Sequence, residues 1–363
     1  MQMRKIALQD RSLTHMTFVR RTPPVPSIVY DTYWRFAAER QAIYHRRITG
    51  RPAPWTADAI LAAHKFTNAY RAADRVSQYL IQRVIYARPA DLIDTVFRIL
   101  FFKLFNKPST WELLESRFGE ILSTCFSVDA YDSVLNDALR RGHTIYSGAY
   151  IMPSGPISVR TPRKHRMHLE LLARALRDRL PERLATARSM GDAYHLLLAL
   201  PGIGPFLAFQ FVTDLNYSAW LSFSEMTFVV PGPGARDGLR KCFTSFGDYS
   251  EAEVIRWVAE RQDDEFAQRG LKFVSLWSRS LQLIDCQNLF CEVDKYARVA
   301  HPEIRGLSGR SKIKQRFVPD PRPLRPWFPP KWELNERIGG GSASVPVYEG
   351  RFSLEGQTLP LGI

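Results

Sequence analysis

Residues 196–209 read LLLALPGIGPFLAF, and this stretch decides how the chain folds around it. One apolar helical run stops at Leu-Pro-Gly-Ile-Gly, and a second apolar run begins at once. Gly202 and Gly204 lack a Cβ, so the turn between the runs can adopt positive φ and approach another surface closely. Its N–H groups would lie at the start of the next helix, where the helix dipole favours an anion. The pattern is typical of a helix-hairpin-helix that holds a DNA phosphate, and the alternative is an ordinary tight turn between packed helices.

The charge of the chain also favours a polyanionic partner. There are 50 Lys and Arg residues against 36 Asp and Glu, which gives a net charge of +14 and an isoelectric point near 9.8. A balance of this kind supports nucleic-acid binding but carries no information about the fold. The alternative is a basic protein with no such partner. Much of the positive charge lies in short clusters, at 46–47, 140–141, 160–166 and 305–316.

Length and composition limit the protein class. With 363 residues, of which 45% are hydrophobic, the chain can bury the core of one large or two modest domains. No apolar run is long enough to span a membrane, and the first residues lack the apolar core of a signal peptide. The four cysteines form no CxxC pair. We therefore expect a cytoplasmic protein that needs no metal or cofactor.

The pattern of apolar residues predicts a mostly helical, all-α fold with a minor strand pair. We expect an N-terminal arm over residues 1–27, a helical domain over 28–300, and a Pro- and Gly-rich tail over 301–363. A helix is predicted from Ser27 onward, another from about Thr56 to Arg88, and a third over 271–298. A Gly- and Pro-rich loop is predicted over 147–164, and the candidate strands are KIAL, PISVR and TFVV.

Three further segments carry residue types suited to DNA chemistry. In KFTNAYRAADR (65–75), Asn68, Arg71 and Arg75 recur at helical spacing beside Asp74. Amide and guanidinium groups can contact a base edge or hold a DNA backbone. The alternative is an exposed face of salt bridges.

The second segment is PGPGARDG (231–238), whose Gly-Pro steps predict a rigid loop followed by a helix that Arg236 and Asp237 open. Asp237 could cap that helix or project into a cleft as a catalytic carboxylate. In the third segment, DCQNLFCEVDKYARV (285–299), helical spacing aligns Asn288, Glu292 and Lys295 on one edge. The neighbouring stripe holds Gln287, Cys291 and Asp294, and the alternative for both is a solvated surface.

These segments, in this order, resemble the alpha-glutamyl/putrescinyl-thymine pyrophosphorylase family over roughly residues 28–300. That family is also described as the helical domain associated with 5-hydroxymethyluracil DNA kinases, and as a derivative of the helix-hairpin-helix DNA glycosylases. The resemblance implies a two-lobed, glycosylase-like helical fold. It also implies an enzyme for modified bases in double-stranded DNA, in particular phage DNA.

The sequence departs from that pattern in three places. Pro205-Phe206 stands where a bifunctional glycosylase has a lysine, which excludes lyase chemistry at that position. About 20 residues past the turn, where the glycosylase Asp is expected, the chain has Ser224-Glu225. There is no GxxxxGK[ST] motif, so P-loop kinase chemistry is not expected from this chain.

Our prediction from the sequence is a monofunctional DNA glycosylase that flips a modified base and cleaves its N-glycosidic bond, with a role in antiviral defence. A carboxylate would stabilise the developing sugar cation, with Asp237 ranked first, Glu292 second, and Asp294 and Glu225 as further candidates. Two alternatives stay open: a transferase that displaces pyrophosphate from a phosphorylated hydroxymethyl-pyrimidine, and a non-catalytic DNA-binding module that partners a kinase. The predicted DNA contacts are Gly202, Gly204, Phe206, Asn68, Arg71, Arg75, Arg236, Lys241, Gln287, Asn288 and Lys295. The aromatic residues that we predict to stack on bases lie in loops and are Tyr146, Tyr150, Trp220 and Phe223.

Overall fold

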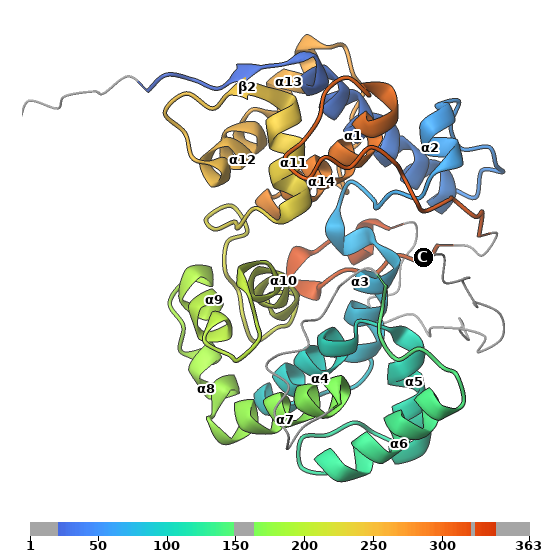
Figure 1. The fold of residues 1–363 in the computed structure, drawn as a ribbon, viewed down its shortest axis with the longest axis vertical. Helices are drawn as coiled ribbons and strands as arrows, with labels where there is room; N and C mark the ends of the chain where they lie inside the picture. The colour runs from blue at the N-terminus through green and yellow to red at the C-terminus, as the bar shows by residue number, and fades with distance from the viewer. Residues whose placement is uncertain (1–20, 149–162, 321–323, 339–363) are drawn as a thin grey trace, which may run out of the picture.

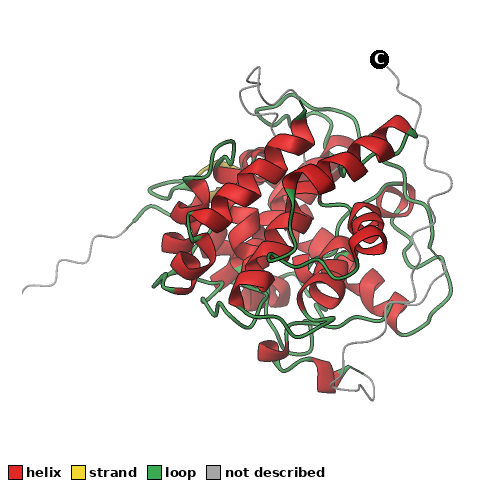
Figure 2. Cartoon of the chain, turned by 90° about the horizontal axis from the view of Figure 1, so that it is seen from below, coloured by secondary structure: helices red, strands yellow, loops and turns green. Residues whose placement is uncertain are grey.

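A computed structural model of the protein describes residues 21–148, 163–320 and 324–338. These residues are mostly helical, as the sequence predicts, and the strands are confined to one short pair (Figure 2). The predicted strands KIAL and PISVR, Tyr150, most of the N-terminal arm and the middle of the 147–164 loop lie outside the described residues. Among the described residues, no helix combines the length and apolar character needed to cross a membrane.

The helices form two lobes, one above the other in Figure 1. The chain begins in the upper lobe, passes through the lower lobe and returns, so the upper lobe is built from both ends of the helical region. The upper lobe contains α1 (Ile28–Ile48), α2 (Ala59–Ala63), α11 (Pro233–Cys242), α12 (Glu251–Glu260), α13 (Gln262–Gln268) and α14 (Leu283–Ala300). It also contains a strand pair, in which β1 (Val25–Pro26) lies antiparallel to β2 (Phe243–Ser245).

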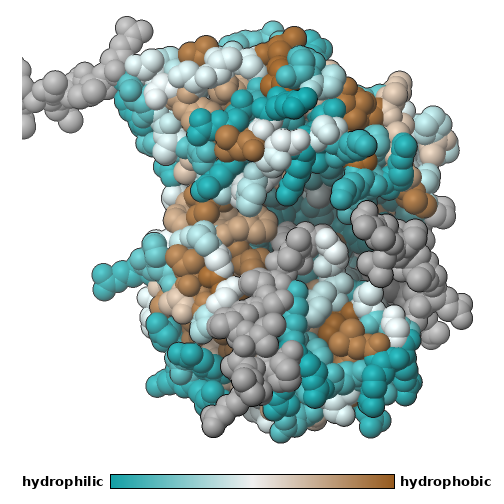
Figure 3. Space-filling model, viewed as in Figure 1, coloured by the Kyte–Doolittle hydropathy of each residue, from teal (hydrophilic) through white to brown (hydrophobic). Residues whose placement is uncertain are grey.

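The lower lobe is a continuous run of the chain. A 3₁₀ turn, η1 (Arg71–Ala73), leads into it from the upper lobe. The helices that follow are α3 (Arg75–Tyr79), the π-helical turn η2 (Leu80–Ile85), α4 (Leu92–Phe105), α5 (Pro108–Phe118), α6 (Val128–Arg140), α7 (Lys164–Arg177), α8 (Leu180–Ala185), α9 (Met190–Leu198) and α10 (Pro205–Leu215). Hydrophilic residues cover much of the face seen in Figure 3, with apolar patches between them.

Helix α1 follows directly from its sequence. The Ser27 side chain accepts a hydrogen bond from the N–H of Val29 and caps the first turn. The buried residues include Tyr33 and Trp34, whose rings meet edge to face, and Tyr33 also packs against Phe290 of α14. The predicted helix from Ser27 is therefore confirmed, and it joins the core of the upper lobe.

Helices α11 and α14 lie in close contact because α11 has glycine where the two helices meet. A Cβ on Gly234 would collide with the Cys291 side chain, and a Cβ on Gly238 would overlap the backbone carbonyl of Phe290. Two of the glycines in PGPGARDG thus serve helix packing. Helix α11 begins at Pro233 with Gly232 as its N-cap, so Asp237 lies in the second turn. The prediction that Arg236 and Asp237 open this helix is wrong.

Three other elements differ from their predictions. The long helix predicted from Thr56 to Arg88 is interrupted, because residues 64–70 leave helical geometry after α2 and His64 pairs with Arg316 in an isolated bridge. The helix predicted over 271–298 begins only at Leu283. The predicted strand TFVV is irregular, and the strands that form are the pair β1–β2.

Part of the predicted C-terminal tail is built into the core. Trp327, Phe328 and Leu334 are buried, on either side of the short turns η3 (Pro330–Trp332) and η4 (Asn335–Arg337). The N–H of Trp327 donates to Gln78 in the lower lobe, and Arg337 donates to the carbonyl of Trp277 on the segment that leads into α14. This segment therefore lies between the lobes, as the red ribbon in Figure 1 also indicates.

Candidate nucleic-acid interface

The turn between α9 and α10 is tight, anchored and open to solvent. Ile203 is buried and its N–H donates to the carbonyl of Leu200. Gly202 has a φ of +77°, the left-handed region that glycine adopts without strain. A Cβ placed on either Gly202 or Gly204 would meet no protein atom within 4 Å. Internal packing therefore does not require glycine at Gly204, and the space beside both residues is available to a ligand.

Two helices begin next to this turn. Helix α10 starts at Pro205 after Gly204, whose lack of a side chain leaves the first turn of the helix without a side-chain cap. The N-cap of α11, Gly232, lies against the ring of Phe206, and a Cβ there would stand 2.7 Å from that ring. The positive ends of two helix dipoles thus lie close together, which favours an anion at this surface.

Gln287 of α14 borders the same junction. Its amide nitrogen is 3.6 Å from the position that a Cβ on Gly232 would occupy. Gln287 is buried, and its Oε1 has no hydrogen-bond partner among the described residues. The structure therefore brings together Gly204, Phe206 and Gln287, three of the predicted DNA contacts from two distant segments. The neighbouring Asn288 is partly exposed on α14.

Residues 65–75 do not form the helical DNA-contacting edge that the sequence predicts. Arg71 is buried, and its guanidinium donates to Asp214, Gln210 and Tyr217 of the lower lobe. Burial alone would raise the pKa of Asp214, but Arg71 and Lys103 lower it below its usual range. This buried cluster fixes η1 to α4 and α10, which is neither a base-reading edge nor an exposed salt-bridged face.

Asn68 and Arg75 also have internal partners. The Asn68 side chain accepts from Arg40 and donates to the carbonyl of Ala73, while its backbone N–H donates to Asp74. Burial raises the pKa of Asp74 to about 7. The exposed Arg75 pairs with Asp320 at 3.0 Å. Asn68 therefore shapes the chain at the start of the lower lobe.

All four candidate carboxylates are held by other parts of the protein. Asp237 is buried and accepts from both the N–H and the hydroxyl of Ser308. Glu292 accepts from the N–H of Thr67 and pairs with Lys295 at 2.7 Å. Asp294 forms ion pairs with Lys241 and Arg298, and Glu225 forms an ion pair with Arg279.

The other cationic residues that we predicted to contact DNA, Lys241, Arg236 and Lys295, also form ion pairs. The side chain of Lys241 is 1% exposed and its ammonium lies 2.9 Å from the carboxylate of Asp294, so α11 and α14 are joined by a buried ion pair. Arg236 is about half exposed and pairs with Glu251 of α12 at 3.1 Å. Lys295 lies over the ring of Phe66 as well as beside Glu292. These three cations are therefore not gathered at the α10–α11 junction.

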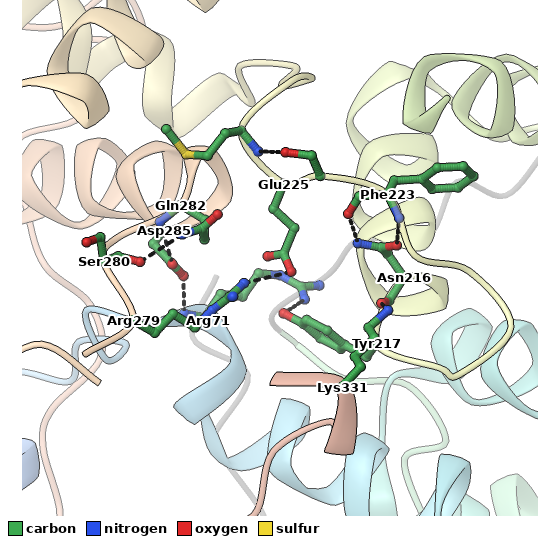
Figure 4. Close-up of polar contacts among 12 residues, drawn as sticks. Arg71, Asn216, Tyr217, Phe223, Glu225, Arg279, Ser280, Gln282, Asp285 and Lys331 are labelled. Carbon is green, nitrogen blue, oxygen red and sulfur yellow. Dashed lines mark hydrogen bonds and ion pairs between the residues drawn. The ribbon is translucent and has the colours of Figure 1, made fainter. Parts of the chain in front are cut away.

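The sequence did not single out Asp285 as a site residue, although it begins one of the quoted segments. Its carboxylate accepts from the N–H of Arg71 at 2.8 Å and from the N–H of Gln282 at 3.0 Å (Figure 4). It therefore caps α14 and ties that helix to η1. Burial raises the pKa of Asp285 to about 7.

A second group of charges lies beside Asp285 at the junction of the lobes. Glu225 pairs with Arg279 at 2.8 Å, and the Arg279 guanidinium lies 3.8 Å from the centre of the Trp332 ring. The ammonium of Lys331 donates to three backbone carbonyls of residues 216–221. Burial lowers its pKa to about 8. No pattern of spacing could have joined these residues, because they come from three separate loops.

Among the aromatics predicted to stack on bases, Trp220 is 48% exposed. Tyr146 is partly buried against Phe105, and its hydroxyl forms a hydrogen bond of 2.7 Å with Nδ1 of His168. The carbonyl and N–H of Phe223 both bond to Asn216, which closes the loop after α10. Trp220 is therefore the most exposed of these three residues.

Comparison with known proteins places the chain in a family. The family model described as the helical domain of 5-hmdU DNA kinase matches residues 27–306. A 5-hmdU DNA kinase of Bacillus phage SP10 is 24% identical over 299 residues, which cover 77% of this chain and 46% of that protein. The chain thus spans about half the length of this relative. No solved structure matches the chain.

These matches overturn the prediction of a hydrolytic glycosylase. The relative is named a kinase, which is a transferase, and neither match points to hydrolysis of an N-glycosidic bond. The descent from helix-hairpin-helix glycosylases and the antiviral role stay predictions that no comparison tests. With its match over residues 27–306, the chain belongs to the family of 5-hmdU DNA kinase helical domains.

Proposed function

We propose that this chain is a DNA-binding helical module that holds duplex DNA carrying a modified pyrimidine and works together with a 5-hmdU DNA kinase activity. The observation that carries the proposal is the open turn at Gly202 and Gly204, where the space beside both glycines is empty and two helix N-termini converge. The net charge of +14 supports a polyanionic partner. The family match is the reason for proposing that this DNA carries a modified base.

In this proposal the turn contacts a phosphate through backbone N–H groups. Such contacts position DNA without reading its sequence, so the affinity should be similar for many sequences. The buried pairs of Asp237, Glu292, Asp294 and Glu225 support a binding role, because each carboxylate already stabilises the fold through another residue. The kinase chemistry would come from a separate active site, since the sequence has no GxxxxGK[ST] motif.

A transferase that displaces pyrophosphate from a phosphorylated hydroxymethyl base is the second candidate. One observation favours it: Asp285, with a pKa of about 7, lies at the junction of the lobes, and a group with that pKa suits general-base chemistry. Its two backbone hydrogen bonds favour a structural role instead.

The test is to incubate the protein with two duplexes of one sequence, containing either thymine or 5-hydroxymethyluracil. Binding is followed by fluorescence anisotropy, and the DNA is then analysed by mass spectrometry. A second set uses the phosphorylated and pyrophosphorylated hydroxymethyl base with candidate amines. We expect submicromolar binding and unchanged DNA mass in every case. A new adduct would establish the transferase instead, and failure to bind any duplex would refute the binding module.

A further inference from the structure

A separate cationic depression lies on the upper lobe, on α1 and on residues 270–274 between α13 and α14. Its volume is about 520 Å³, within the range of small-ligand sites. Its lining includes the cations Arg35, Arg51 and Lys272 and the apolar residues Ala42, Leu271 and Val274. None of these residues belongs to the turn or the helix junction described above.

The charges around this depression are strongly unbalanced. Arg35, Arg51 and Lys272 are exposed, and none of them forms an ion pair with a residue in the described part of the chain. The carboxylate in the lining, Glu39, pairs with Arg46 at 2.8 Å. Within the described ranges, these three cations therefore have no carboxylate partner, whereas many exposed arginines elsewhere are paired with carboxylates.

The dipole of α1 explains only part of this charge. Arg46 lies in the last turn of α1, where a cation complements the negative end of the helix. Arg35 lies near the middle of the same helix, and Lys272 comes from a different segment. Because the dipole acts within the last turn, these two cations need another reason to converge.

The floor of the depression is apolar. Ala38 and Ala42 come from one face of α1, and Leu271 and Val274 come from the loop after α13. Val274 is 43% exposed, so a ligand could cover apolar surface that water now touches. Burial lowers the pKa of the His45 imidazole, and its ring contacts the carbonyl of Val274.

We propose that this depression binds a mononucleotide, with its phosphate against Arg35, Arg51 and Lys272 and its base over the alanine, leucine and valine floor. An inorganic anion would use the cations alone, and a DNA backbone would not need the apolar lining residues. The combination of three uncompensated cations with an apolar floor is the chemistry that recognises a nucleoside phosphate.

The experiment measures binding of dTMP, thymidine and inorganic phosphate to the full chain by isothermal titration calorimetry. Wild-type protein should bind dTMP more tightly than it binds thymidine or inorganic phosphate. The double substitution Arg35→Gln with Lys272→Gln should weaken dTMP binding about tenfold or more, because hydrogen bonds from charged donors are lost. The control Arg177→Gln with Lys314→Gln removes two exposed cations elsewhere and should leave dTMP binding unchanged.

A second variant tests the floor. Ala42→Leu should weaken dTMP binding while sparing inorganic phosphate, provided that circular dichroism shows an unchanged helical content. Equal affinities for phosphate and dTMP would overturn the proposal, and so would an unchanged dTMP affinity in Ala42→Leu. Substitutions at this site that weaken duplex DNA binding but not dTMP binding would also overturn it. Because Gly204→Val lies in the other lobe, it should leave dTMP binding intact, which separates this site from the DNA-binding function.

Discussion

The guanidinium of Arg71 lies 2.7 Å from the carboxylate of Asp214, and both side chains are almost completely buried. Lys103 lies 3.0 Å from the other carboxylate oxygen of Asp214. The backbone N–H of Arg71 donates to Asp285 on α14, in the upper lobe. One residue therefore links the lower lobe, through its side chain, to the upper lobe, through its backbone.

Arg71→Met should destabilise the protein by about 3 kcal/mol or more, because removing one partner of a buried ion pair leaves charge without compensation. Urea unfolding followed by circular dichroism measures the loss. Arg75→Met is the matched control, since its pair with Asp320 is more than half exposed on the arginine side and should contribute about 1 kcal/mol or less. Equal effects of the two substitutions would show that the Arg71 cluster is not a stabilising link.

Asp74 should make the protein less stable as the pH rises from about 4 to about 7. Its pKa is raised by burial from 3.8 to about 7, so the folded state holds a proton in that window that the unfolded state has lost. Asp74→Asn removes this dependence and keeps an oxygen that can accept from the N–H of Asn68. The stability of the variant relative to wild type should therefore rise with pH, by on the order of 3 kcal/mol, and level off above pH 8. A difference that does not change with pH would contradict the raised pKa.

Gly238→Ala should destabilise the protein by about 2 kcal/mol or more, although alanine normally stabilises a helix relative to glycine. The reason is that the new Cβ would overlap the carbonyl of Phe290 and force α11 away from α14. Thermal unfolding of Gly238→Ala and of the control Gly148→Ala, where the space is open, makes the comparison. Similar melting temperatures for the two variants would mean that the helices do not pack as closely as described.

DNA binding should weaken steeply as salt is added. Each duplex phosphate neutralised by the protein contributes roughly 0.9 to the slope of log affinity against log salt concentration. Anisotropy titrations at several NaCl concentrations should give a slope of several units, in line with the net charge of +14. A flat dependence would indicate that the basic surface serves another purpose.

The sequence predicted the helical class and the turn more reliably than the roles of single side chains. Apolar periodicity and Ser27 predicted α1, and the glycines at 202 and 204 predicted a tight break between α9 and α10. Both signals are local, so they could be read from neighbouring residues. The helix predicted from Thr56 to Arg88 failed because residues 63–65 pair with residues 315–317, a segment about 250 positions away.

The partners of these side chains could not be predicted, for a related reason. Asn68, Arg71, Asp237 and Lys241 are polar residues at regular spacing, which is equally compatible with a binding surface and with buried ion pairs. Their partners, such as Asp214 and Ser308, come from distant segments and are revealed only by the fold. The same holds for the cationic depression on α1, whose Lys272 is more than 200 residues from Arg35 in the chain.

The most direct test of DNA binding at the turn is the affinity of Gly204→Val for a 5-hydroxymethyluracil duplex. Gly204 has ordinary backbone angles and empty space around its Cβ position, so valine should leave the fold unchanged and block only an external contact. Gly148→Val is the matched control, because the space there is also open. We predict that Gly204→Val weakens binding about tenfold or more while Gly148→Val binds like wild type. Wild-type affinity in a folded Gly204→Val variant would contradict the assignment of this turn as the DNA contact.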